Sequence, residues 1–220
     1  MPLMRSMAPT AVSMALSTPT TSFVSGTELA LGVDSAIETA VGAIDRIRGT
    51  AISHNRGHIV KVMGSDSGYL ALMSAIAGGV EVALVPEFET RPEEILRLLE
   101  GAYEQGKSHF IVVAAEGAEL SAERLQEYIN ETEGTYEADL TAVGHIQSGG
   151  DPTAGDRILA ARLGAAAVAA LADGDYGTMV GVRGEDVRRV SLEEVVREAE
   201  EYAVEVVREA EEYAVDRESV

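Results

Sequence analysis

Four short apolar runs alternate with helical segments along this chain, and the alternation restricts it to one fold class. The runs are rich in β-branched and small apolar residues, and they occupy 58–63, 80–86, 109–115 and 138–143. The segments before and between them have helical spacing or helix caps, at 32–47, 68–77, 92–105 and 121–131. Runs of this length are typical of buried strands. We therefore expect an α/β fold, a doubly wound and mainly parallel sheet with helices on both faces.

The next part of the chain continues the same pattern. Asp151 and Pro152 predict the start of a long helix over 153–171, because proline is favoured in the first turn of a helix. Short strands are expected at 178–182 and 187–190.

Residues 191–220 predict one acidic helix, which begins with a capping box formed by Ser191 and Glu194. Within it VVREAEEYAVE recurs as VVREAEEYAVD, and eleven residues are close to three helical turns, so one side-chain stripe repeats. The stripe suits a partner-binding or coiled-coil helix. It also suits a terminal helix that packs on its own domain or stays solvated.

The net charge of −20, from 37 acidic and 17 basic residues, argues against nucleic acid and anionic membranes as partners. The absence of cysteine excludes disulfides and thiolate chemistry. Only Lys61 and Lys107 are lysines, which favours either a high-salt cytoplasm or a GC-rich genome. We expect a cytoplasmic protein, because no apolar stretch reaches the ~18–20 residues of a membrane span.

The first 25 residues differ in character from the rest. No acidic residue precedes Glu28, and Arg5 is the only charged side chain before it. We expect 1–25 to be a disordered leader, or sequence not native to the domain. A targeting peptide is the alternative, although no strong apolar core follows Arg5.

Polar side chains follow three of the expected strands, at the ends where ligands bind in open α/β sheets. They are the turn that contains Gly64, the carboxylate of Glu116 and the imidazole of His145. A carboxylate and an imidazole at neighbouring strand ends suit sugar hydroxyls or acid–base chemistry, and the helix after the turn favours an anion. The alternative is structural, with Ser67 as a helix cap, His145 bonded to a loop and Glu116 solvated. His54 and His58 are two ligands short of a metal site.

Several motifs occur in the order and spacing of a known family. They are VMG at 62–64, SGYLALMSAIAGG at 67–79, GHIQ at 144–147, GG-x-P at 149–152 and DRILAARLG at 156–164. From about Gly26 to Val196 the chain resembles the C-terminal, fructose 6-phosphate-binding half of the 6-phosphofructokinases, with a phosphofructokinase-like lobe expected over 26–190. The resemblance implies a fold of two similar lobes, usually in a homotetramer.

The resemblance also implies site residues. Fructose 6-phosphate would bind mainly to this lobe, whereas ATP or pyrophosphate, with Mg²⁺, would bind mainly to the lobe that precedes it. Four residues match sugar-binding positions, namely Met63, Gly64, Glu116 and His145. Arg56 matches an arginine donated by a neighbouring subunit. The positions of a nucleotide effector site are occupied by Arg48, Glu81 and Lys107.

The departures from the family pattern concern catalysis and phosphate binding. The glycine-rich donor loops have no counterpart, and the N-terminal nucleotide lobe is expected to be largely missing. Thr21 and Phe23 stand where the motif TIDND has its aspartates, so neither can act as the catalytic base. Three phosphate-binding arginines are replaced, by Ser65, Asp139 and Ser148. No residue of this chain supports the donor or Mg²⁺, and we expect no turnover by the chain alone.

Three hypotheses follow from these features. The chain is the sugar half of a kinase whose other lobe is supplied elsewhere, a non-catalytic regulatory or binding lobe that pairs with an intact homologue, or a truncated gene remnant. In each case we expect self-association into a homo-oligomer or pairing with a homologue, because a missing lobe would leave apolar surface exposed.

Overall fold

The computed structural model describes residues 12–14, 26–54, 56–65, 67–104, 106–107, 109–132 and 137–197. These residues form two compact units, which are considered one at a time. The parallel-sheet unit consists of the described residues in 32–156, and the hairpin unit consists of those in 12–31 and 157–197. The repeat expected over 198–220 lies outside the described residues, as do Thr21 and Phe23.

The parallel-sheet unit contains four parallel strands in the order β3-β4-β2-β5. The strands are β2 (Gly57–Val62), β3 (Val82–Leu84), β4 (Phe110–Ala115) and β5 (Ala138–Ala142). The helices are α1 (Val33–His54), α2 (Tyr69–Gly78), α3 (Pro92–Glu104), α4 (Ala122–Glu131) and the 3₁₀ helix η2 (Gly144–Gly149). The α/β fold expected from the sequence is confirmed in this unit.

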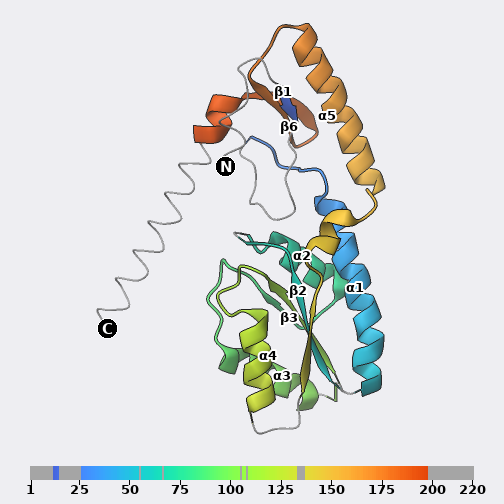
Figure 1. Ribbon diagram of the computed structural model, residues 1–220, viewed down its shortest axis with the longest axis vertical. Helices are drawn as coiled ribbons and strands as arrows, with labels where there is room; N and C mark the ends of the chain where they lie inside the picture. The colour runs from blue at the N-terminus through green and yellow to red at the C-terminus, as the bar shows by residue number, and fades with distance from the viewer. Residues whose placement is uncertain are drawn as a thin grey trace, which may run out of the picture. The chain divides into compact units, whose positions relative to one another are not determined.

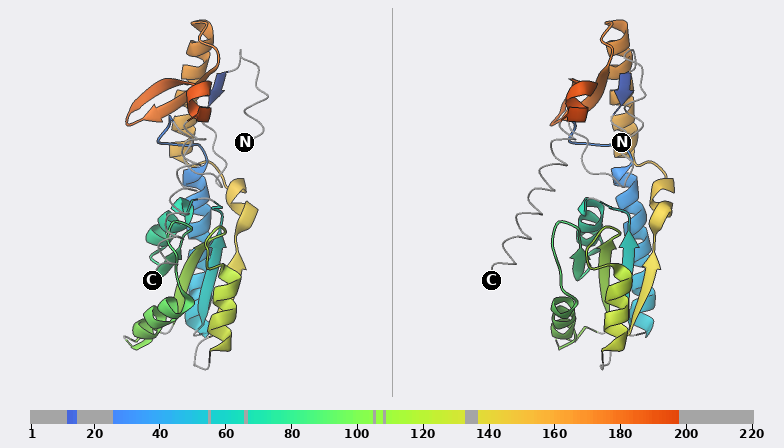
Figure 2. Two further views of the ribbon diagram at one scale, coloured as in Figure 1. Left: turned by 90° about the vertical axis from the view of Figure 1, so that its left-hand side faces the viewer. Right: turned by 60° about the vertical axis from the view of Figure 1, so that its left-hand side comes forward.

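Both faces of this sheet are covered, because successive residues of a strand point to opposite faces. On β4, Val112 and Ala114 pack with α3 and α4, whereas Ile111 and Val113 pack with α1 and α2. All six residues of β4 are buried, which explains why HFIVVAA reads as a continuous apolar run. Figure 1 and Figure 2 show α1 on one side of the sheet and α3 with α4 on the other.

The hairpin unit contains a separate three-stranded sheet in the order β1-β6-β7. Its strands are β1 (Val12–Met14), β6 (Thr178–Arg183) and β7 (Asp186–Ser191). The two short strands expected at 178–182 and 187–190 form, but they do not extend the parallel sheet. Gly184, with φ of +61°, and Glu185 are the only residues between β6 and β7, and so short a connection permits only antiparallel pairing.

Strand β1 lies within the segment expected to be a disordered leader and pairs with β6 in parallel. The other residues of 1–25 lie outside the described residues. After β7, residues 192–197 are helical. The hydroxyl of Ser191 accepts a hydrogen bond from the amide of Glu193 at 3.2 Å, one residue earlier than a capping box with Glu194 requires.

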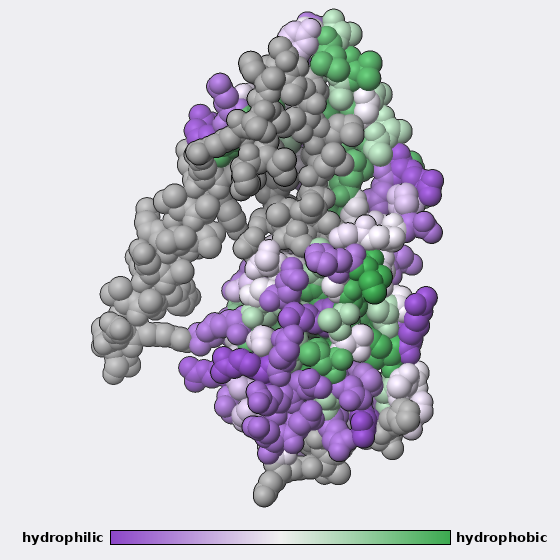
Figure 3. Space-filling model, viewed as in Figure 1, coloured by the Kyte–Doolittle hydropathy of each residue, from purple (hydrophilic) through white to green (hydrophobic). Residues whose placement is uncertain are grey.

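Helix α5 (Ala154–Ala172) packs Leu159 and Leu163 against Val180 and Val182 of β6. Its sequence is apolar on all sides, so the opposite side exposes large hydrophobic side chains, Ile158, Val168 and Leu171. Figure 3 shows α5 as a largely hydrophobic surface. Even so, no helix among the described residues is long and apolar enough to cross a membrane.

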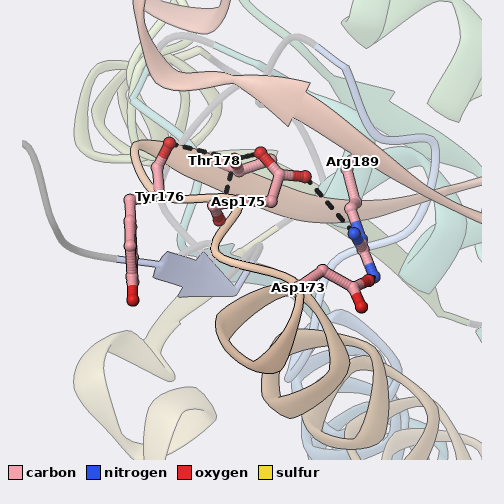
Figure 4. Close-up of polar contacts among 5 residues, drawn as sticks. All are labelled: Asp173, Asp175, Tyr176, Thr178 and Arg189. Atoms are coloured by element: carbon pink, nitrogen blue, oxygen red, sulfur yellow. Dashed lines mark hydrogen bonds and ion pairs between the residues drawn. The ribbon is translucent and has the colours of Figure 1, made fainter.

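Arg189 connects β7 to the turn between α5 and β6. Its guanidinium lies 2.8 Å from a carboxylate oxygen of Asp173 and 3.4 Å from one of Asp175 (Figure 4). The hydroxyl of Thr178 donates to Asp175 at 2.8 Å, so Asp175 contacts both strands of the hairpin. These pairs are solvent-accessible, and we expect each to contribute little to stability.

A buried carboxylate fixes the start of α1 in the parallel-sheet unit. Asp156 is 6% exposed, and it accepts hydrogen bonds from the backbone amides of Gly32 at 2.9 Å and of Ser35 and Thr153 at 3.2 Å. The first two amides belong to the first turn of α1, where no backbone carbonyl is available to accept them. Burial alone would raise the pKa of the Asp156 carboxyl, but hydrogen bonds from Gly32, Thr153 and Ser35 outweigh it and lower the pKa.

We predict that Asp156→Asn lowers the free energy of unfolding at pH 7 by about 1–3 kcal/mol, measured by urea denaturation. The lowered pKa means that the wild-type carboxylate contributes its stability above the unfolded-state value of about 3.9 and loses it as the pH falls through the folded-state value. The difference between the two proteins should therefore shrink in acid. Asp173→Asn is the control, since its exposed ion pair should change stability by less than about 1 kcal/mol. Equal effects of the two substitutions would contradict the assignment.

Candidate functional site

The loops after β2 and β4 are joined by backbone hydrogen bonds at the carboxyl edge of the parallel sheet. The amide of Glu116 donates to the carbonyl of Val62 at 3.0 Å. The amide of Gly117 donates to the carbonyl of Gly64 at 2.9 Å. The pairing of β2 with β4 thus continues beyond the last strand residues, and it fixes Glu116 beside the loop that contains Gly64.

The loop after β5 approaches β2 from the other side. The amide of Val143 donates to the carbonyl of Lys61 at 2.9 Å, and η2 begins at the next residue. Gly144 has φ of +51°, and the exposed His145 follows it on η2. The structure therefore brings Gly64, Glu116 and His145 to one edge, which we call the sugar edge together with Met63.

The loop between β2 and α2 contacts its neighbours so closely that glycine is required at two positions. Gly64 has φ of +139°, where other residues are strained. A Cβ at Gly117 would lie 1.8 Å from the carbonyl oxygen of Ser65. The two glycines allow the loops after β2 and β4 to pack main chain against main chain.

The side chain of Gln147 is the polar group of this edge that sequence reasoning missed. It is 1% exposed, its Oε1 accepts from the amide of Met63 at 2.7 Å, and its Nε2 donates to the carbonyl of Ala36 at 3.3 Å. Met63 is also buried, and the hydroxyl of Ser148 donates to its Sδ at 3.4 Å. The motif GHIQ contained the signal, since a glutamine between apolar and small residues gives no indication of burial until the fold is known.

The amino end of α2 is occupied by a carboxylate of the chain itself. Both oxygens of Glu87 lie within hydrogen-bond distance of the amide of Gly68, at 2.8 and 3.0 Å. The hydroxyl of Ser67 accepts from the amide of Tyr69 at 3.3 Å, so Ser67 acts as a helix cap. The anion expected at this helix terminus is thus supplied internally by Glu87.

Arg56 does not lie at the sugar edge. It precedes β2, at the amino edge of the sheet, and pairs with Glu137 at 2.6 Å and Asp139 at 3.7 Å. The six residues of β2 separate it from Met63, which corresponds to roughly 20 Å of strand. Its role across a subunit interface stays a prediction.

Glu81 and Lys107, expected at an effector site, form an ion pair of 2.8 Å, and Glu81 also accepts from the amide of Ile111 at 2.9 Å. Burial would raise the pKa of Glu81, but the bonds from Lys107 and Ile111 outweigh it and lower the pKa. Arg48 donates to the carbonyls of Gly78 and Gly79, at the carboxyl end of α2. All three side chains have partners within the chain.

A family model described as phosphofructokinase matches residues 20–171. The chain belongs to the phosphofructokinase family. The ATP-dependent 6-phosphofructokinase of Listeria welshimeri is 42% identical over 178 residues, which make up 80% of this chain and 54% of that protein. This phosphofructokinase chain therefore spans about half the length of the curated relatives it matches.

Solved phosphofructokinases share the fold. The enzyme of Saccharomyces cerevisiae superposes with a TM-score of 0.75 at 30% identity, over 83% of this chain and 26% of that chain. A pyrophosphate-dependent phosphofructokinase of Marinobacter aquaeolei gives a TM-score of 0.72 at 20% identity, over 84% and 52% of the two chains. The second likeness shows the fold alone.

The ATP-dependent relatives make Mg²⁺ an implied ion for this phosphofructokinase chain. No group of three or more His, Asp or Glu side chains within the described residues is arranged to hold a metal ion. These residues do not fit Mg²⁺ by themselves, and no chemical step is derived through it.

The close approach at Gly117 leads to a test. We predict that Gly117→Ala lowers the free energy of unfolding by about 1–3 kcal/mol, because the new Cβ displaces the backbone at Ser65. Gly101→Ala is the matched control, since Gly101 lies inside α3 with no atom within 4 Å of an added Cβ, and it should stabilise by about 0.4–1 kcal/mol. Urea denaturation measures both, and a neutral Gly117→Ala would disprove the packing argument.

Proposed function

We propose that this chain is the C-terminal, sugar-binding half of a 6-phosphofructokinase and that the sugar edge binds fructose 6-phosphate. The observation that supports this most directly is the position of Gly64, Glu116 and His145, which three neighbouring strands of one sheet place at the same carboxyl edge. Relatives that are 42% identical are ATP-dependent 6-phosphofructokinases, and this chain matches about half of their length.

The side chains of the sugar edge suit a polyol. The ionised carboxylate of Glu116 accepts hydrogen bonds from sugar hydroxyls, and the imidazole of His145 either donates or accepts. Both side chains are exposed while their backbones are fixed, so they reach a ligand without rearrangement of the loops. Met63 contributes its buried main chain, which holds the loop in place.

In the proposed reaction, a hydroxyl of the sugar attacks the terminal phosphoryl group of ATP or pyrophosphate. That step needs a base for the hydroxyl proton and cationic groups for the transferred phosphate. Thr21 and Phe23 cannot act as the base. We therefore propose that turnover requires a donor lobe from another polypeptide, in a homo-oligomer or with an intact homologue in the cytoplasm.

We predict that the purified chain binds fructose 6-phosphate without turning it over. A coupled assay in molar KCl, with ATP and pyrophosphate in parallel, should show no product, while titration calorimetry should detect the sugar phosphate. Glu116→Gln should weaken binding, because an amide replaces the charged acceptor. Turnover with either donor would refute the inactive half. Binding of a nucleoside diphosphate alone would favour the regulatory lobe, through Arg48, Glu81 and Lys107. Binding of no ligand by folded protein would leave the remnant.

The lack of cations at the sugar edge yields a second prediction. Ser148→Arg should tighten fructose 6-phosphate binding by about 10- to 100-fold, since a charge-assisted hydrogen bond to phosphate contributes about 1.5–3 kcal/mol. Fructose, which has no phosphate, should bind as before. Ser53→Arg adds the same charge on α1, away from the sugar edge, and should have little effect in molar salt. An equal gain from both substitutions would attribute the effect to net charge.

A further inference from the structure

We propose that Gln147 is a positioning residue, whose single buried amide holds the backbone of Met63 in the geometry that the sugar edge needs. This inference rests on the proposed function, because the ligand of that edge is taken to be fructose 6-phosphate. Nothing in the reading of the sequence assigned Gln147 a role beyond membership of the motif GHIQ.

The amide of Gln147 joins three segments that are far apart in the sequence. The residue itself belongs to η2, its Oε1 accepts from the amide of Met63 after β2 at 2.7 Å, and its Nε2 donates to the carbonyl of Ala36 on α1 at 3.3 Å. The side chain is 1% exposed, so neither bond can be replaced by solvent. One side chain therefore fixes the spacing between η2, α1 and the loop after β2.

The two bonds require an acceptor and a donor on the same planar group. An amide supplies both, whereas a carboxylate only accepts and an alkyl group does neither. Loss of Gln147 would leave the Met63 amide and the Ala36 carbonyl buried without these partners, which is costly. The loop after β2 would then move to reach other partners or water.

Movement of that loop would act directly on the sugar edge. Gly64 follows Met63 and accepts from the amide of Gly117, the residue after Glu116. His145 lies two residues before Gln147 on the same η2 turn. A displacement of Met63 therefore alters the positions of Gly64, Glu116 and His145 relative to one another, although Gln147 is too deeply buried to touch the ligand.

Two leucine variants separate positioning from general loss of stability. Gln147→Leu should weaken fructose 6-phosphate binding by about 10- to 100-fold in titration calorimetry. Gln126→Leu is the matched control, since the Nε2 of Gln126 donates to the carbonyl of Ala138 at 3.0 Å, away from the sugar edge. It should lower stability and leave the affinity within about twofold of the wild type. A folded Gln147→Leu protein with wild-type affinity would overturn the proposal.

Gln147→Glu provides a rescue that a purely structural role would not produce. When protonated, the introduced carboxyl donates to Ala36 through its O–H and accepts from Met63 through its C=O, as the amide does. Burial raises the pKa of such a carboxyl, so the neutral form is present at low pH and is lost as the pH rises through that pKa. The ratio of variant to wild-type affinity should be close to one near pH 5 and fall about tenfold or more by pH 8. A ratio that does not change with pH would overturn the proposal, even if the leucine variant fails to fold.

A measurement without ligand keeps this inference distinguishable from the proposed function. The ¹⁵N-amide resonance of Met63 should titrate with the introduced carboxyl in Gln147→Glu and stay constant over that pH range in the Gln126→Glu control. If the wild-type chain binds no fructose 6-phosphate, the proposed function fails, and the Met63 resonance alone decides whether Gln147 positions the loop. A Met63 resonance that does not titrate would refute the positioning role.

Discussion

The pairing of β2 between β4 and β5 is the interaction on which the rest of the parallel-sheet unit depends. β2 is hydrogen-bonded in parallel on both sides, with Gly57 opposite both Phe110 and Ala138. The same pairing continues past its last residue, through the amides of Glu116 and Val143. Register therefore decides which residues meet at the sugar edge, and a slip of one residue would exchange the two buried faces of the strand.

Carboxylates that accept backbone amides recur in this acidic chain. Asp156 accepts from the first turn of α1, Glu87 from the amide of Gly68 before α2, and Glu81 from the amide of Ile111 at the start of β4. At a helix start a negative charge is stabilised by unpaired amides and by the helix dipole. Part of the large negative charge thus has structural roles, and at α2 it occupies a position where an external anion would otherwise bind.

The two edges of the parallel sheet have different chemistry. The carboxyl edge presents Glu116 and His145, and the amino edge presents Arg56, which pairs with Glu137 and Asp139. Within one chain, Arg56 cannot share a ligand with the carboxyl edge, because the length of β2 separates them. In the function we propose, cationic contacts to a phosphate must therefore come from a second polypeptide, as must the base for phosphoryl transfer.

The sequence by itself determined the fold class, because strand-length apolar runs that alternate with helices permit few arrangements other than a parallel α/β sheet, and its motifs indicated the family. It did not separate β6 and β7 from the parallel sheet, since strand propensity carries no information about which edge a strand joins. Only the tertiary structure showed that Gln147 is buried against Met63 and Ala36 and that Glu87 occupies the start of α2. Such contacts join residues 19 to 111 positions apart, and local sequence patterns do not encode them.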